Sequence, residues 1–261
     1  MTRAANVAIL TYHGLSKNGE DSANGLYTLE EKMFQAQMTS LAEQAMSVIS
    51  LKDLIAHPAG EPLPRKAVVI TFDDGHASDF SVALPVLKRH RFQATFFVNP
   101  GTLDQEGYLT TKTLRQMRSE GMEIGSHGYD HLFLTTLDEK SLRYQIVESR
   151  KKLEALLGAP VSFFSVPRGR YNRRLLEVAK EAGYLAVLSS DIGFNRDPQA
   201  SLCLRLWAIK QAYRFEDFRS IVEGRPKAHL RLEVALKQAA RRALGHAVYE
   251  AVRTRILGEK A

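Results

Sequence analysis

The segment Val68-Val69-Ile70-Thr71-Phe72-Asp73-Asp74-Gly75-His76 places two adjacent carboxylates and a glycine directly after an apolar, β-branched run. Such a run predicts a buried strand that ends at the carboxylates. Neighbouring anions raise each other's pKa unless a cation takes up their charge. Asp73 and Asp74 therefore require a positive partner from elsewhere in the chain.

The best candidates for that partner site lie about fifty residues downstream, in Ser126-His127-Gly128-Tyr129-Asp130-His131. Two imidazoles four residues apart can face one cation from a single helical turn. Together with one aspartate they supply three ligands and leave one position open, which is the pattern of a catalytic metal site. This ligand set suits zinc, and iron, cobalt or nickel would also be accepted.

The rest of the chain alternates short apolar strands with helices, which predicts parallel strands covered by helices. Seven or eight such units in 261 residues favour a closed α/β barrel rather than an open sheet. The expected strands lie near residues 7–10, 47–51, 68–72, 94–98, 122–125, 161–165, 185–188 and 202–207. The expected helices lie near residues 28–44, 78–89, 111–120, 137–157 and 172–182.

Polar side chains follow several of these strands, at the end where the active sites of α/β barrels form. They are His13, Asp73, Asp74, Asn99, His127, Arg168 and Asp191. Simpler interpretations exist for each, because an Asp-Asp pair also suits a turn, a lone histidine can be a core residue, and Asn99 or Asp191 can cap a loop. The placement of all of them at strand ends favours one shared cleft.

Thr71-Phe72-Asp73-Asp74-Gly75, together with the His127-to-His131 spacing, resembles the polysaccharide deacetylases of the NodB-homology type, carbohydrate esterase family four. The resemblance implies a distorted (β/α)7-8 TIM-like barrel that removes acetyl groups from N-acetylated sugars. It further implies that Asp73 is the general base and that Asp74, His127 and His131 are the metal ligands. It covers roughly residues 7–191.

Two motifs depart from that family. Where the family has Arg-Pro-Pro-Tyr-Gly, this chain has Ser165-Val166-Pro167-Arg168-Gly169, so Ser165 replaces the arginine that orients the base. The backbone amide of Arg168 is still expected to bind the oxyanion. The usual late histidine is missing, but Thr11-Tyr12-His13 is similar to the arrangement in exopolysaccharide-biosynthesis deacetylases with permuted motif order. We therefore assign His13 as general acid, with Asp191 as a weaker candidate for orienting it.

The resemblance predicts a metal-dependent de-N-acetylase that acts on a glycan or glycan precursor in cell-surface or exopolysaccharide biosynthesis. The alternatives are a hydrolase of other non-peptide C–N bonds on a small molecule, and a carbohydrate-binding relative without turnover. The expected partner of the de-N-acetylase is an N-acetylated glycan or lipid-linked sugar.

Charge divides the chain into an expected barrel, residues 1–210, and a basic helical C-terminal extension, residues 211–261. Residues 201–261 hold 13 of the 36 basic and 6 of the 29 acidic residues, and so carry the whole net charge of +7. The extension's helical pattern, near residues 214–223 and 230–257, favours packing on the barrel or contact with an anionic membrane over nucleic-acid binding.

The compartment is predicted from what the sequence contains near its start and from its cysteine content. Cys203 is the only cysteine, so no intrachain disulfide is possible. The first residues form no long apolar segment, and no run approaches eighteen apolar residues. We therefore expect a cytoplasmic enzyme, with peripheral membrane contact through the C-terminal helix as a further possibility.

Overall fold

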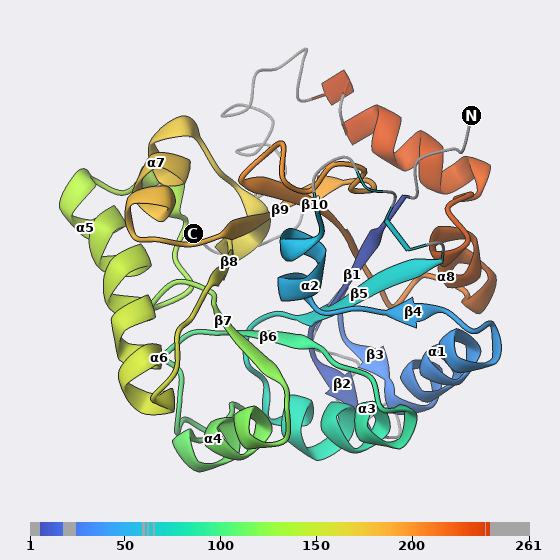
Figure 1. Cartoon of the computed structure of the whole chain (residues 1–261), viewed down its shortest axis with the longest axis horizontal. Coiled ribbons are helices and arrows are strands. Elements are labelled where there is room, and N and C mark those ends of the chain that lie inside the picture. Colours follow the sequence, from blue (N-terminus) through green and yellow to red (C-terminus); the bar gives the residue numbers. More distant parts are fainter. Residues whose placement is uncertain are drawn as a thin grey trace.

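The computed structural model describes residues 6–17, 25–58, 61, 63–64, 66–237 and 239–240. Within them, seven parallel strands close into a ring, because β1 pairs with β10 on one side and with β5 on the other (Figure 1). The ring strands are β1 (Ala8–Tyr12), β5 (Ala67–Phe72), β6 (Thr95–Val98), β7 (Glu123–Ser126), β8 (Phe163–Ser165), β9 (Ala186–Ile192) and β10 (Cys203–Ala208). The predicted α/β barrel is confirmed, with seven strands in its wall.

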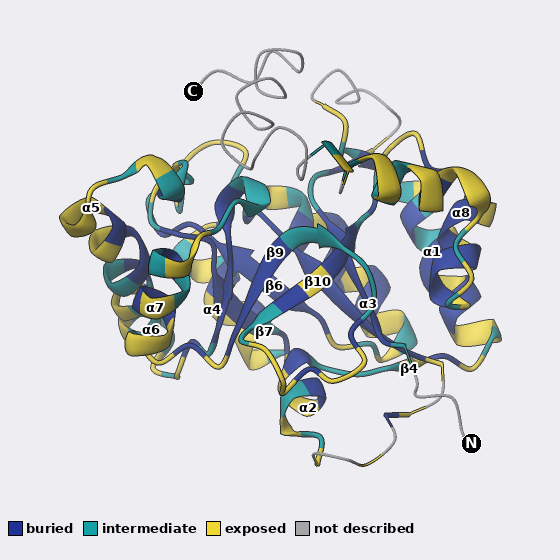
Figure 2. Ribbon diagram, turned by 90° about the horizontal axis from the view of Figure 1, so that it is seen from above, coloured by how far each residue is buried: buried dark blue, intermediate teal, exposed yellow. Residues whose placement is uncertain are grey.

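Helices lie around this ring, and their outward sides carry the exposed residues, which are yellow in Figure 2. The α-helices are α1 (Glu31–Glu43), α2 (Leu51–Ala56), α3 (Leu84–His90), α4 (Thr111–Ser119), α5 (Glu139–Arg143), α6 (Ser149–Leu157), α7 (Arg173–Glu181) and α8 (Phe215–Val222). Short 3-10 and π segments are η2 (Asp79–Ala83), η3 (Leu134–Thr136), η4 (Tyr144–Glu148) and η5 (Pro167–Gly169). Segments α5, η4 and α6 follow one another directly and form the long helix expected near residues 137–157.

The strand expected at residues 47–51 is reduced to β4 (Ser47–Val48), which pairs with the start of β5 and lies outside the ring. The Ser50 hydroxyl accepts the amide of Asp53, and this capping box starts α2 at Leu51. Two further short strands, β2 (Leu15–Ser16) and β3 (Leu29–Glu30), form a separate pair. Because β3 occupies Leu29 and Glu30, α1 begins at Glu31, later than the sequence predicts.

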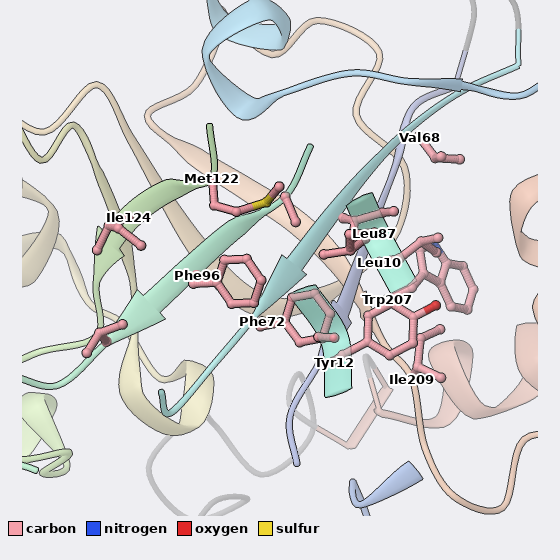
Figure 3. Packing of buried hydrophobic residues seen from close by; sticks show 14 of the residues in the cluster. Leu10, Tyr12, Val68, Phe72, Leu87, Phe96, Met122, Ile124, Trp207 and Ile209 are labelled. Atoms are coloured by element: carbon pink, nitrogen blue, oxygen red, sulfur yellow. The ribbon is translucent and has the colours of Figure 1, made fainter. Parts of the chain in front are cut away.

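The core has two parts, divided by the barrel wall. Outward-facing residues pack against the helices, and Figure 3 shows the rings of Tyr12, Phe72 and Phe96 on three neighbouring strands. The Phe72 and Phe96 rings stack with centroids 4.6 Å apart. A second cluster, which includes Ile9 and Val69, shares the other face of the same strands and fills the barrel interior.

This alternation determines where the polar residues lie. Along β1 and into its following loop, Ile9, Thr11 and His13 share the inner face. Thr11 is paired in register with Thr71, and their hydroxyls are 2.9 Å apart. The barrel interior therefore changes from apolar at the amino ends of the strands to polar at their carboxyl ends, where Asp73 follows β5.

The C-terminal extension begins with elements that pack on the barrel. Phe218 and Ile221 of α8, and Leu230 after it, are buried in the main core. Residues 228–237 are helical, and most of the helix predicted over residues 230–257 lies outside the described residues. Among the described residues, no helix combines the length and apolarity needed to cross a membrane.

Candidate metal and active site

Asp74, His127 and His131 bring their side chains together at the carboxyl ends of β5 and β7. One ligand atom from each lies within 4.8 Å of the others. Asp74 Oδ1 is 3.3 Å from His127 Nε2 and 3.2 Å from His131 Nε2. Two imidazoles and one carboxylate that converge in this way fit a divalent cation and leave coordination positions for water and substrate.

The segment from His127 to His131 is a loop, so the expected single helical turn is wrong. Gly128 has φ of 76° and His131 has φ of 55°, which no helical turn accommodates. The side-chain amide of Asn99 donates to the carbonyls of His127 and Gly128. Gln145 Oε1 accepts hydrogen bonds from the backbone amides of Tyr129 and Asp130. These two buried side chains determine the path of the loop.

The His127 ring is oriented from behind the cluster. Its Nδ1 lies 2.8 Å from the carbonyl oxygen of Ser165. Because that oxygen can only accept, Nδ1 donates its proton to it, and Nε2 is the ring atom that faces Asp74. Nε2 is therefore the atom available to bind a metal.

Asp74 lies at a strained position among three histidine side chains. Its φ of 78° is unusual for a residue other than glycine, and such strain is often found at functional sites. Burial alone would raise the pKa of Asp74, but hydrogen bonds with His127, His131 and His76 outweigh it and hold the pKa well below its usual range. Asp74 is therefore ionised, as a ligand must be.

The second carboxylate, Asp73, is almost completely buried and is held by Ser165. The Ser165 hydroxyl donates to Asp73 Oδ2 at 3.0 Å. Asp73 Oδ1 has no hydrogen-bond partner among the described residues. Ser165 thus contacts Asp73 from the position of the missing arginine, but its hydroxyl is an uncharged donor. Asp73 Oδ1 is left able to accept a proton.

His13 lies beside Asp73, because the amide of Asp73 donates to the Tyr12 carbonyl at 2.9 Å. The His13 ring stacks on Tyr27, with centroids 4.7 Å apart and planes 20° apart. Burial lowers the pKa of His13, although the negative charges of Asp74 and Asp73 act to raise it. His13 Nδ1 has no hydrogen-bond partner among the described residues, so ring packing orients this histidine.

Arg168 projects its side chain towards Phe133. Its guanidinium carbon is 4.1 Å from the ring centroid, and that of Arg170 is 4.4 Å from the same ring. Arg168 has φ of 58° at the tight turn η5, and Gly169 follows it with φ of 69°. A Cβ at Gly169 would stand 2.1 Å from Ser190 Cβ, so only glycine lets this turn approach β9.

These residues surround one cavity of about 320 Å3, which Asp191 does not line. The carboxylate of Asp191 accepts the Tyr171 hydroxyl at 2.8 Å. The orientation of His13 by Asp191 stays a prediction. The lining consists of Thr11, His13, Tyr27, Asp73, Asp74, His127, His131, Ser165, Val166, Arg168, Gly169, Ser189, Ser190, Leu206 and Ala208.

Sequence reasoning missed or set aside several residues of the site. His76 is not among the site residues predicted from the sequence, yet its Nε2 lies 3.5 Å from Asp74 Oδ2 and its ring stacks on Tyr108. Asp79 is fully buried, and burial together with the negative charges of Asp74 and Asp73 raises its pKa well above the usual range. Its position soon after Gly75 was the only available signal.

Comparison with known proteins identifies relatives of this chain. The family model for polysaccharide deacetylase matches residues 60–187. YxkH of Bacillus subtilis strain 168, provisionally named a polysaccharide deacetylase, is 30% identical over 223 residues, which is 85% of this chain and 78% of YxkH. A peptidoglycan-N-acetylglucosamine deacetylase of Bacillus cereus is 32% identical over 139 residues, which is 53% of this chain and 62% of that protein.

Solved structures share the fold. The Streptococcus pyogenes deacetylase PplD in complex with acetate has a TM-score of 0.77 at 24% identity, over 85% of this chain and 100% of PplD. IcaB from Ammonifex degensii has a TM-score of 0.73 at 21% identity, over 84% of this chain and 97% of IcaB. At these identities the likeness concerns the barrel itself.

Proposed function

The chain belongs to the polysaccharide deacetylase family, and we propose that it is a metal-dependent hydrolase that removes N-acetyl groups from a glycan or glycan precursor. The observation that carries this proposal is the single cavity lined by Asp73, Asp74, His127, His131 and His13. The match to a protein named peptidoglycan-N-acetylglucosamine deacetylase supports an N-acetylated sugar as the substrate class.

Hydrolysis of an amide near neutral pH makes three demands on the protein. Water must lose a proton to become a sufficient nucleophile, negative charge on the acyl oxygen must be stabilised, and the departing amine must gain a proton. Each demand corresponds to a group in the cavity.

Asp74, His127 and His131 would hold the divalent cation. A cation bound there supplies Lewis acidity, which lowers the pKa of water from about 15.7 towards ~7. The ligand set suits zinc, and iron, cobalt or nickel would also fit. The Ser165 carbonyl accepts the Nδ1 proton of His127 and so leaves Nε2 to face the cation. His76 contacts the other carboxylate oxygen of Asp74.

Asp73 is the general base in this proposal. Its Oδ2 is engaged by Ser165, so the proton of the attacking water passes to Oδ1, which faces no other donor among the described residues. Ser165 and the backbone contact with Tyr12 restrict the carboxylate to one orientation. The neutral Ser165 contact replaces the charged one that the family's arginine supplies.

His13 and the Arg168 amide serve the other two demands. His13 adjoins Asp73 across the β1–β5 pair, so one face of the cavity holds both proton-transfer groups. Once protonated, His13 would donate to the departing sugar nitrogen. Arg168 and Gly169 form a tight turn and line the same cavity, which supports the Arg168 amide as the oxyanion donor.

Cell-surface or exopolysaccharide biosynthesis is the proposed setting, and the position of His13 directly after the first strand supports it. A cytoplasmic location with peripheral membrane contact also stays a prediction. Leu232 and Leu236, one turn apart in residues 228–237, are 58% and 60% exposed, which suits such contact. Recovery of the native protein from fractionated cells in the soluble or the membrane fraction tests the location.

Release of acetate from N-acetylglucosamine oligomers by the metal-reconstituted protein tests the activity. The wild type is expected to release acetate, and Asp73→Asn is expected to lose roughly a hundred- to ten-thousand-fold in kcat while still binding one metal per chain. Undiminished activity in Asp73→Asn would remove it from the mechanism. If the wild type binds one metal but releases no acetate from any N-acetylated oligomer, the chain is a binding protein rather than a hydrolase.

A further inference from the structure

A second cavity, of about 560 Å3, lies where β9 and β10 meet the helix of residues 228–237. It shares no lining residue with the first cavity. Along β10, Leu206 lines the first cavity, whereas Arg205 and Trp207 on the opposite face of the strand line the second. The second cavity is therefore on the outside of the barrel wall.

Three arginines from three different segments line this cavity, and its lining contains no acidic residue. Arg196 follows β9, Arg205 belongs to β10, and Arg231 belongs to the helix of residues 228–237. Arg205 and Arg231 form no ion pair with the described residues, and Arg196 Nε donates to the neutral side chain of Asn6 at 2.8 Å. The cavity thus concentrates positive charge that the described chain does not neutralise.

Neighbouring groups support this arrangement of the arginines. A Cβ at Gly193 would stand 2.9 Å from Arg205 Cδ, so glycine allows the arginine stem to lie against the chain. The acidic residue of the helix, Glu233, is engaged by Lys210 and by Lys237, the latter at 2.8 Å. Its charge is therefore compensated by lysines.

Trp207 forms part of the wall of this cavity. Its side chain is 3% exposed, and its ring lies 5.5 Å from that of Phe194. Its indole Nε1 is buried and has no hydrogen-bond partner among the described residues. An indole nitrogen can only donate, and a buried donor without an acceptor is unfavourable. Packing against Phe194 therefore holds the ring in the cavity wall.

We propose that this cavity binds the phosphate group of a phosphorylated molecule. Arginine guanidinium groups match phosphate oxygens with paired hydrogen bonds, and the three arginines approach from separate segments. A volume of about 560 Å3 exceeds the need of an inorganic anion, so it accommodates the group that the phosphate esterifies.

Trp207 is the only tryptophan in the chain, so its fluorescence reports on this cavity directly. The full chain, loaded with metal, is titrated with inorganic phosphate and with glycerol 3-phosphate at constant ionic strength. The expected result is a saturable change in emission that chloride does not produce. Arg205→Gln and Arg231→Gln are each expected to weaken binding by roughly ten-fold or more, because each removes a charge-assisted contact.

Arg173→Gln is the matched control, since it removes the same charge from a side chain that is 93% exposed on α7. It is expected to bind phosphate as the wild type does. Phosphate bound at the metal centre would persist in Arg205→Gln, which separates the two sites. Circular dichroism and melting temperature verify that each variant is folded.

Vesicles distinguish the two sources of a phosphate group. A saturable response to soluble phosphate or its ester indicates a soluble ligand, whereas a response confined to vesicles of anionic phospholipid indicates a lipid headgroup; both support the site. A response equal for anionic and neutral vesicles, with none to soluble phosphate, overturns the proposal. So does unchanged affinity in both Arg205→Gln and Arg231→Gln.

Discussion

The two sides of the catalytic cavity are held by different forces. On the side of the proposed metal ligands, hydrogen bonds fix the loop and one of its rings. Asn99 and Gln145 hold the loop from His127 to His131, and the Ser165 carbonyl holds the His127 ring. On the opposite side, His13 has no such bond at Nδ1 and is stacked on Tyr27. Hydrogen bonds therefore restrict the direction in which the His127 ring points, whereas stacking restricts mainly where the His13 ring lies.

This difference matches the two tasks that we assign. A cation requires its donor atoms at fixed distances and angles, which hydrogen bonds behind the ligands supply. A proton donor needs to approach the leaving group only when the substrate is bound, and ring stacking permits that adjustment. The two sides should therefore respond differently to substitution.

Asp74→Ala should have the largest effect. Loss of the carboxylate at the centre of the three imidazole contacts is expected to abolish metal binding and to reduce kcat/KM by roughly a thousand-fold or more, since a bound metal contributes several kcal/mol. Metal content by mass spectrometry and acetate release measure the two effects. Asp197→Ala, at an exposed position, is the control, and a full complement of metal in Asp74→Ala would show that the ligands lie elsewhere.

His13→Ala tests whether the two sides are independent. It is expected to lower kcat by roughly a hundred- to ten-thousand-fold, as removal of a general acid does, while leaving one metal per chain. The control is His90→Ala, whose ring stacks on Phe92 at the end of α3. Loss of metal in His13→Ala would mean that His13 belongs to the ligand side, and the contrast between the sides would disappear.

Gln145→Leu tests the hydrogen bonds behind the ligand side. The leucine would leave the amides of Tyr129 and Asp130 without their acceptor, which is expected to destabilise the protein by about 1–3 kcal/mol and weaken metal affinity by roughly ten- to a hundred-fold. Denaturant unfolding and metal titration measure these changes. Gln116→Leu removes an exposed contact with Glu120 and should leave metal affinity unchanged; equal losses in both variants would contradict the role of Gln145.

The ligand side was the more predictable part of the site because its signals are local in sequence. The Asp-Asp pair after an apolar run and two histidines four apart are visible without a structure, and the alternation of strands and helices predicted the barrel. What failed was local geometry: Gly128 and His131 adopt positive φ, so the loop could not be recognised from spacing that also suits a helix. The strand at 47–51 was overestimated because the capping box at Ser50 was not recognised.

The supports of the site could not be predicted, because their partners are distant in the sequence. Ser165 contacts Asp73 across 92 positions, and Asn99 contacts His127 across 28. Nothing in the sequence near Tyr27 indicates that its ring lies on His13, since the loop before it has no periodic pattern. Pairing of β2 with β3, in which the Leu29 amide donates to the Gly14 carbonyl, brings residues 13 and 27 close together.

Tyr27 should give the smallest effect and the sharpest test of the stacking argument. An aromatic pair is worth about 0.5–1.5 kcal/mol, so Tyr27→Ala is expected to lower kcat by roughly two- to twelve-fold with metal content unchanged. Tyr27→Phe keeps the ring and should retain most of the activity. If Tyr27→Phe loses as much kcat as Tyr27→Ala, the hydroxyl rather than the stack is responsible. If only KM rises in Tyr27→Ala, the ring binds substrate and His13 is positioned by the barrel wall alone.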